Sequence, residues 1–112
     1  MELLIENVIN VGADEFYRAS RYKIPLSVVF INTKNKKAFN ILEKNIRQID
    51  IVQQLSSQTI VLFLPHTDTH SAELVIRKLK DIFTFTYTMR EFNSSEHTFI
   101  EALALENMQK LD

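Results

Sequence analysis

Three histidines are the residues whose type and spacing first suggest a metal site. His66 and His70 flank Asp68, and His97 follows further along the chain. The chain has no cysteine to complete a tetrahedral set of zinc ligands. A predicted helix N-cap at Asp68 separates His66 from His70, so the two imidazoles would not share one helix face. We therefore predict three surface histidines and no bound metal.

Other side chains give weak support for hydrolysis or nucleic-acid binding. The serines and threonines are not arranged as a nucleophile elbow: Ser56, Ser57, Thr67, Thr69 and Ser71. The aromatic residues near the C-terminal third are more typical of a core than of a base-stacking platform: Phe83, Phe85, Tyr87 and Phe92. With 13 Lys+Arg and 14 Asp+Glu the net charge is -1, so no overall field attracts nucleic acid or an acidic membrane.

Length and composition favour one small domain. A chain of 112 residues can bury a single core without disulfides, so we expect one domain over 1–112 with an N-terminal helical segment at 1–22. Met1 to Glu6 carries acid where a signal peptide carries base, and no apolar run approaches the roughly 20 residues of a membrane span. We expect a soluble, cytoplasmic protein without a cofactor or a membrane partner.

Hydrophobic periodicity predicts the elements that position these side chains. We expect a helix over 3–22 that breaks near Gly12, the only glycine. Further segments follow in the order strand, helix, hairpin, helix, strand, helix: 24–31, 35–46, 49–64, 69–82, 83–89 and 95–108. In the last two helices Ile82 and Met108 are predicted to face the core. The predicted sheet contributes Val28, Phe30, Val61 and Phe63 to a core under the helix over 72–82. Such an order gives an α+β fold with an antiparallel or mixed sheet.

The hairpin is the stretch with the most specific pattern. Ile49, Ile51 and Leu55 lead into a polar turn. The apolar run from Ile60 to Leu64 then predicts a strand buried on both faces, and Pro65 ends it because proline has no backbone donor.

This hairpin resembles the signature hairpin of the GGDEF family, the diguanylate cyclases. In that family an Arg-x-x-Asp pair shortly precedes Gly-Gly-Asp/Glu-Glu-Phe, and a hydrophobic strand ending in proline follows. Here Arg47 and Asp50 match the pair, while Ser56-Ser57-Gln58-Thr59-Ile60 occupies the five signature positions. The resemblance extends from about Tyr17 to about Met108 and includes the segment Arg21 to Ser27 before the first strand. It implies a two-layer sandwich of the nucleotidyl-cyclase or ferredoxin-like type, with a mixed antiparallel sheet and helices packed on it.

The segment Gly12-Ala13-Asp14-Glu15-Phe16 matches the family motif more closely in letters. It precedes the first predicted strand, however, so no hairpin can form around it. We interpret it as helix surface with one core residue, Phe16.

The resemblance also implies which positions would hold metal and nucleotide in an active cyclase. The family's carboxylates are replaced by Asn32 and Lys34 after the first strand and by Gln58 and Thr59 in the turn; Ser56 and Ser57 replace two glycines. Asn40 matches a guanine-reading residue, but its acidic neighbour is Ile41. A neutral amide is a poor ligand for magnesium. We therefore predict no enzymatic activity. Alternatively, Asn32, Lys34, Lys36 and Lys37 form only a solvated loop.

Three functions remain open. The first is an inactive GGDEF-like signalling module that pairs with itself or with a partner signalling protein. The second is a receptor for cyclic di-GMP, because Arg47 and Asp50 match the family's inhibitory site and their side chains can bind guanine edges. Lys78 would add a phosphate contact, and Arg47→Ala would then weaken binding with little change in melting temperature. If no ligand binds, Arg47 and Asp50 are interpreted as an ion pair that was inherited with the fold, with Arg47 at the end of a helix. An active diguanylate cyclase is the remote third alternative.

Overall fold

The helices and strands follow one another in the predicted order. The computed structural model describes residues 1–111. Its elements are α1 (Glu2–Val11), α2 (Ala13–Tyr22), β1 (Leu26–Asn32), α3 (Ala38–Asn45), β2 (Ile51–Gln54), β3 (Thr59–Pro65), α4 (Thr69–Lys80), β4 (Thr86–Glu91) and α5 (Glu96–Met108).

Several boundaries differ from the sequence-based ones, and the starts of α3 and β4 differ most. Helix α3 begins three residues later than predicted, at Ala38 instead of Asn35, because local side chains first form a turn. There the Thr33 hydroxyl accepts from the Asn35 N–H and the Asn35 side chain accepts from the Lys37 N–H. Strand β4 begins at Thr86, and the buried Phe83 and Phe85 precede it.

The strands form one antiparallel sheet in the order β2-β3-β1-β4. β1 and β3 lie in its centre, and every residue of both strands is buried. Their register places Phe30 opposite Val61 and Asn32 opposite Thr59. The predicted α+β class with an antiparallel sheet is thereby confirmed.

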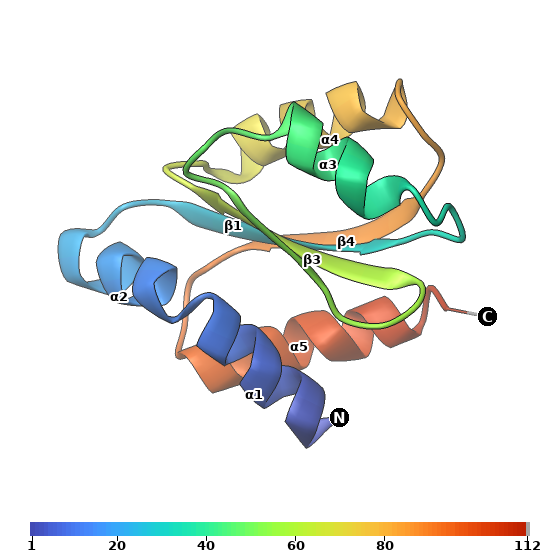
Figure 1. Ribbon diagram of the computed structural model, residues 1–112. Coiled ribbons are helices and arrows are strands. Elements are labelled where there is room, and N and C mark those ends of the chain that lie inside the picture. The colour runs from blue at the N-terminus through green and yellow to red at the C-terminus, as the bar shows by residue number, and fades with distance from the viewer. Residues whose placement is uncertain (112) are drawn as a thin grey trace.

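Helices cover both faces of the sheet, so the fold has three layers and not the two that the resemblance implied (Figure 1). On one face Val28, Phe30, Val61 and Phe63 pack with residues of α1, α2 and α5. On the other face Val29, Ile31, Leu62 and Leu64 pack with residues of α3 and α4. The prediction that the first four side chains lie under α4 is therefore wrong. Successive strand residues point to opposite faces, so the pattern defines two sets of residues without telling which helix covers each set.

Gly12 lies at the predicted break between α1 and α2. Its φ of -98° is accessible to any residue, but a Cβ there would overlap the buried ring of Phe63. The break brings Phe16 into the core, where its ring is 4.9 Å from that of Phe92 between centroids. The interpretation as helix surface with one core phenylalanine is confirmed for residues 13–16, whereas Gly12 is itself buried.

The two C-terminal helices position the last predicted core residues differently. α4 ends at Lys80, so Ile82 lies beyond it and is 48% exposed. On α5 the core-facing position is Asn107, which is 3% exposed, whereas Met108 is 53% exposed. The predictions for Ile82 and Met108 are wrong. None of the helices within residues 1–111 has the length and apolar character needed to cross a membrane.

The N-terminus of α4 is capped as predicted. The Asp68 carboxylate accepts a hydrogen bond of 2.8 Å from the Ser71 backbone N–H. This bond favours the ionised form and lowers the pKa of Asp68 below its usual value. The cap fixes the start of α4 beside the end of β3.

Candidate functional site

The end of β1 and the start of β3 bring together the two positions that would carry metal-binding carboxylates in an active cyclase. Asn32 lies directly opposite Thr59 in the sheet. The Thr59 hydroxyl donates to Asn32 Oδ1 at 3.2 Å, and the Thr33 N–H donates to the Gln58 carbonyl at 2.9 Å. Two of the positions that the hairpin resemblance assigns to metal-binding carboxylates therefore lie side by side, and both carry uncharged side chains.

Asn32 belongs to a buried polar network with Asn107 of α5. Asn32 Nδ2 donates to Asn107 Oδ1 at 2.8 Å, and Asn107 Nδ2 donates to Asn32 Oδ1 at 3.1 Å. Thr88 adds a hydrogen bond to Asn107 Oδ1 at 3.1 Å, and Asn32 Nδ2 also reaches Thr86 Oγ1 at 3.4 Å. Asn32 and Asn107 are 7% and 3% exposed. The Asn32 amide is thus directed toward α5, and its oxygen already accepts two hydrogen bonds.

The interpretation of Asn32 as part of a solvated loop is therefore wrong, whereas Lys34, Lys36 and Lys37 are exposed as that interpretation expects. Asn107 was not predicted from the sequence to be a site residue. Its position on α5, four residues after Leu103, places it on the core face of the helix, and this spacing was the available signal. A buried asparagine needs a polar partner, and Asn32 supplies it.

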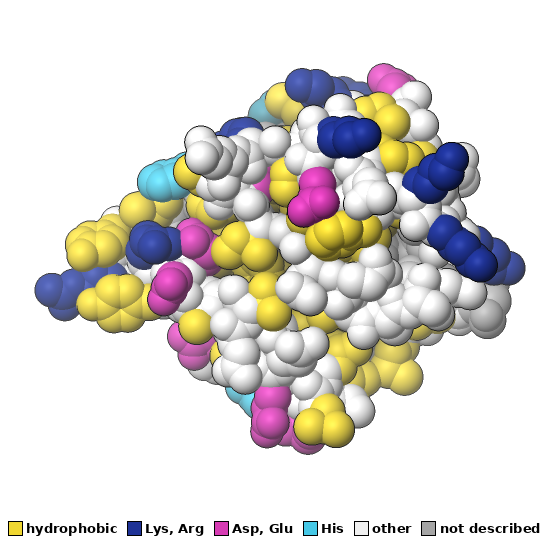
Figure 2. Space-filling model, in the orientation of Figure 1, with side chains coloured by type: hydrophobic (Ala, Val, Ile, Leu, Met, Phe, Trp, Pro, Cys, Tyr) yellow, Lys and Arg dark blue, Asp and Glu magenta, His cyan; other side chains and the backbone are white. Residues whose placement is uncertain are grey.

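The turn between β2 and β3 is exposed and carries no charged side chain. Ser56, Ser57 and Gln58 are all exposed, and the N–H groups of Leu55 and Ser56 both donate to the Thr59 carbonyl. Among the non-glycine residues of 1–111 positive φ occurs only at Lys23 and His66, so this turn forms without left-handed backbone. Figure 2 shows this part of the surface as white, with Lys and Arg side chains farther up the right edge. Asn40 is exposed on α3.

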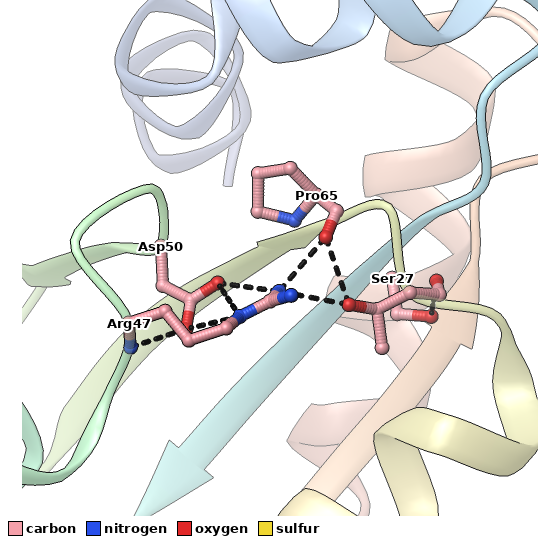
Figure 3. Close-up of polar contacts among 5 residues, drawn as sticks. Ser27, Arg47, Asp50 and Pro65 are labelled. Atoms are coloured by element: carbon pink, nitrogen blue, oxygen red, sulfur yellow. Dashed lines mark hydrogen bonds and ion pairs between the residues drawn. The ribbon is translucent and has the colours of Figure 1, made fainter.

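Arg47 and Asp50 lie at the opposite end of β3 and form an ion pair (Figure 3). Arg47 Nη2 is 2.7 Å and Nε 3.1 Å from Asp50 Oδ1, and the Arg47 backbone N–H donates to Asp50 Oδ2 at 2.7 Å. The Asp50 side chain is only 3% exposed, while that of Arg47 is 48% exposed. The carboxylate is therefore fully engaged, and the guanidinium keeps one side toward solvent.

The guanidinium also connects two loops. Arg47 Nη2 donates to the Pro65 carbonyl at 2.8 Å and to Thr67 Oγ1 at 2.9 Å. Ser27 Oγ donates to the Thr67 carbonyl at 2.9 Å, which links this group to the start of β1. Arg47 thus joins the α3–β2 loop to the β3–α4 loop instead of binding the last carbonyls of α3. The alternative interpretation was an inherited ion pair at a helix end. The ion pair is present, but Arg47 does not contact the end of α3.

A pocket of about 230 Å³ adjoins the ion pair, and Lys78 of α4 lies on its wall together with Arg47 and Asp50. Val75, Leu79 and Ile82 supply apolar lining. Pockets for drug-sized ligands measure about 300–1,000 Å³. This pocket could accept one part of a dinucleotide, such as a base, while the remainder stays outside.

The histidines lie apart on the surface. His66, His70 and His97 are all exposed, as predicted. His97 Nε2 lies 3.1 Å from Glu2 Oε1, which joins the starts of α5 and α1. Within the part of the chain that the structure describes, no three His, Cys, Asp or Glu side chains are grouped to hold a metal ion.

The chain has the fold of the diguanylate cyclases, as the hairpin resemblance implied, and solved structures show it. No family model and no curated protein sequence matches the chain. It is similar to a DGC protein from Thermotoga maritima, with a TM-score of 0.61 and 14% identity over 93% of this chain and 91% of that one. It is also similar to the diguanylate cyclase SiaD from Pseudomonas aeruginosa, solved in complex with its activator SiaC. There the TM-score is 0.69 and the identity 13%, over 95% of this chain and 55% of SiaD.

Proposed function

We propose that this chain is a catalytically inactive GGDEF-like module that acts in signalling by binding another protein or a second copy of itself. Residues 1–112 would form one such domain, with 1–22 as its helical N-terminal segment. The observation that carries the proposal is the buried Asn32–Asn107 network. It places two amide side chains at the end of β1 whose oxygens already accept hydrogen bonds within the protein.

Electrostatics supports the loss of catalysis. Cyclic di-GMP synthesis from GTP needs metal ions to neutralise the charge that develops on the phosphate. Asn32 and Thr59 bring no charge to this position, and Lys34 brings a positive one. At an effective dielectric constant of about 20, two unit charges 4 Å apart interact by about 4 kcal/mol, and a divalent ion doubles this repulsion.

Protein binding is supported by the similarity to SiaD, which was solved with a protein activator. A protein that contains a domain of this fold can therefore take part in a protein complex.

Calorimetric titration with GTP in the presence of magnesium, then of manganese, tests the inactive-site proposal. No heat of binding above that of dilution is expected, because the metal-bearing positions are neutral or basic. Specific binding with a Kd below about 100 µM, equivalent to a binding free energy of about -5.5 kcal/mol, would contradict the proposal.

A second candidate function, a cyclic di-GMP receptor, is favoured by the pocket that Arg47, Asp50 and Lys78 share. The exposed side of the guanidinium would bind guanine O6 and N7, and Lys78 would meet a phosphate. Asp50 would have to exchange part of its bonding to Arg47 for the guanine N1 and N2 hydrogens.

Titration with about 100 µM cyclic di-GMP separates the two candidates, since it detects binding stronger than about -5.5 kcal/mol. The receptor function requires binding by the wild-type protein and a larger loss in Arg47→Ala than in Lys78→Ala. Equal binding by wild-type and Arg47→Ala proteins, or no binding at all, would reject the receptor function. The interaction module would then be the remaining candidate.

A further inference from the structure

Strand β4 forms one edge of the sheet, because it pairs with β1 on one side only. An edge strand has backbone N–H and C=O groups directed away from the sheet, and these can pair with another chain. In an antiparallel strand the two backbone groups of one residue point to the same side, and neighbouring residues alternate. The side chains around β4 therefore determine what can reach this edge.

Two hydrogen bonds show which residues of β4 point outward. The Phe92 N–H donates to the Leu26 carbonyl at 2.7 Å, so the even-numbered residues face β1. The Tyr87 carbonyl instead accepts from Lys110 Nζ at 2.5 Å, outside the sheet. The alternation then directs the backbone groups of Met89 outward, and no residue of 1–111 forms a hydrogen bond with them.

A groove of about 440 Å³ follows this edge. α4 forms one wall, α5 forms the other, and Tyr87 and Met89 of β4 lie at its base. An extended residue in a sheet occupies about 3.3 Å along the strand, about 4.8 Å between strands and about 10 Å across the faces, or about 160 Å³. The groove therefore has room for about three residues of an added strand.

The groove is mainly basic. Arg77, Lys80 and Lys110 line it, and none of them forms an ion pair with another residue of 1–111. Lys80 Nζ lies 5.1 Å and Lys110 Nζ 5.5 Å from the centre of the Tyr87 ring, so two cations converge on one aromatic side chain.

Two glutamates also line the groove. Glu106 is neutralised by Arg90, whose Nη2 lies 2.6 Å from Glu106 Oε1. Glu73 is then the single unpaired acidic side chain of the groove beside three basic ones, so the unpaired side chains carry a net positive charge.

We propose that the outer edge of β4 binds an extended acidic segment of a partner protein, which adds to the sheet as a fifth strand. This inference rests on the proposed function in that it names the surface and the partner chemistry of the interaction. A second copy of the chain is a poor occupant, because two β4 edges would bring two basic grooves together. Alternating acidic side chains would instead meet Arg77, Lys80 and Lys110, while the backbone of the segment pairs with Met89.

Lys110 occupies the position of an incoming donor. Its ammonium binds the Tyr87 carbonyl, the group that would accept an N–H from the added strand. The long side chain can swing away when the segment binds and then pair with one of its carboxylates. If Lys110 only shields the edge, as lysines on edge strands commonly do, no strand is added.

The test uses a capped peptide of alternating threonine and glutamate as the probe, with amide hydrogen exchange followed by NMR. Binding with a Kd below about 1 mM is expected. Exchange of the Met89 amide should slow at least about tenfold in the complex, because this amide gains a hydrogen bond. Two control peptides, one with lysine in place of glutamate and one N-methylated at every amide, should not bind. Equal binding by the N-methylated peptide would overturn strand addition.

Variants of the protein test separately whether binding depends on the basic side chains and on the backbone of β4. Lys80→Glu should weaken binding of the glutamate peptide at least about tenfold, whereas the exposed Lys44→Glu should change it less than about twofold, because α3 packs beside β2 at the opposite edge of the sheet. Met89→Pro removes the outward donor without breaking the bonds to β1, as proline on an edge strand can, and should abolish binding. If Met89→Pro does not fold, the Lys80→Glu and N-methyl results still decide.

Three outcomes contradict the inference: no binding by the wild-type protein, equal binding by Lys80→Glu, or a β4-paired dimer that protects the Met89 amide without peptide. Failure of the proposed function is distinguishable from these outcomes. Synthesis of cyclic di-GMP would reject the inactive module even if the peptide binds, and absence of peptide binding leaves the inactivity untouched.

Discussion

The two ends of β3 carry different kinds of polar contact. At Thr59 the contacts are neutral and buried, and they end in the Asn32–Asn107 amide pair. At Pro65 the carbonyl accepts from Arg47, whose guanidinium is half exposed beside a pocket. The chain thus carries charge at the half-exposed end of β3 and none at the buried end, where the resemblance implies metal-binding carboxylates.

The two ends also differ in what a mutation would leave behind. Exposed ion pairs typically contribute about 0–1 kcal/mol, but the Asp50 side chain is 3% exposed. Loss of its partner would leave a buried carboxylate, which costs more than the pair itself contributes. At the Thr59 end both amides of the pair satisfy each other, so a charged replacement on either side disrupts the network.

The largest expected effect comes from breaking the strand that joins the two ends. Val61 is fully buried between them, and Val61→Asp should unfold the chain because an unpaired buried charge exceeds the marginal stability of a small domain. Thermal denaturation followed by circular dichroism measures this. Gln53→Asp is the matched control, since Gln53 lies opposite Val61 on the exposed strand β2. A cooperatively melting Val61→Asp protein would refute the strand assignment.

Asn32→Asp should destabilise the chain by about 3 kcal/mol, since a carboxylate cannot donate to Asn107 and is buried. Burial raises the pKa of the introduced carboxyl above its unfolded value, so the deficit should grow as pH rises from about 4 to 7. Urea denaturation at both pH values measures it.

Asn40→Asp provides the control for this substitution, because Asn40 is exposed on α3 and should tolerate the charge with little change. A neutral effect of Asn32→Asp would show that the amide network does not close the end of β1.

Arg47→Ala should cost about 2 kcal/mol, because it removes charge-assisted hydrogen bonds to Asp50 and further bonds to Pro65 and Thr67. The structure therefore revises the expectation that this substitution leaves the melting temperature nearly unchanged. Lys78→Ala, on the wall of the same pocket, should change the free energy of unfolding by less than about 0.5 kcal/mol. Equal stability of the two variants would show that the link between the loops contributes nothing.

The smallest effects are expected in the turn near Thr59. Ser57→Ala and Gln58→Ala should each alter the free energy of unfolding by less than about 0.5 kcal/mol, since both side chains are exposed. The same denaturation experiment measures them. A loss above about 1 kcal/mol would mean that the turn contacts something beyond the described residues.

Element order and the hairpin could be predicted from the sequence because strand and helix periods are local. The continuous run from Ile60 to Leu64 is an example, since only a strand covered on both faces buries all its side chains. The covering helix of each face was not predictable from one sequence, so Val28 and Val61 were assigned to the wrong helix. That assignment depends on the path of the chain over the sheet.

Of the candidate site, the sequence matched Asn32 and the hairpin turn to the family's carboxylate positions, but it did not show that Asn32 is buried or where its amide points. Asn107 lies 75 residues away in sequence, and no local pattern joins the two. The Arg47–Asp50 ion pair is local, and the sequence suggested it as one of two interpretations, whereas the bonds of Arg47 to Pro65 and Thr67 depend on the tertiary placement of the α3–β2 loop.

Assay of the purified chain for cyclic di-GMP synthesis tests the central claim most directly. The protein is incubated with GTP and magnesium, and separately with manganese, alongside a diguanylate cyclase such as SiaD as positive control. The products are then separated and identified by mass. The buried, uncharged end of β1 predicts that the chain forms no cyclic di-GMP while the control does. Cyclic di-GMP formed by the chain, and lost on Asn32→Leu substitution, would contradict the account.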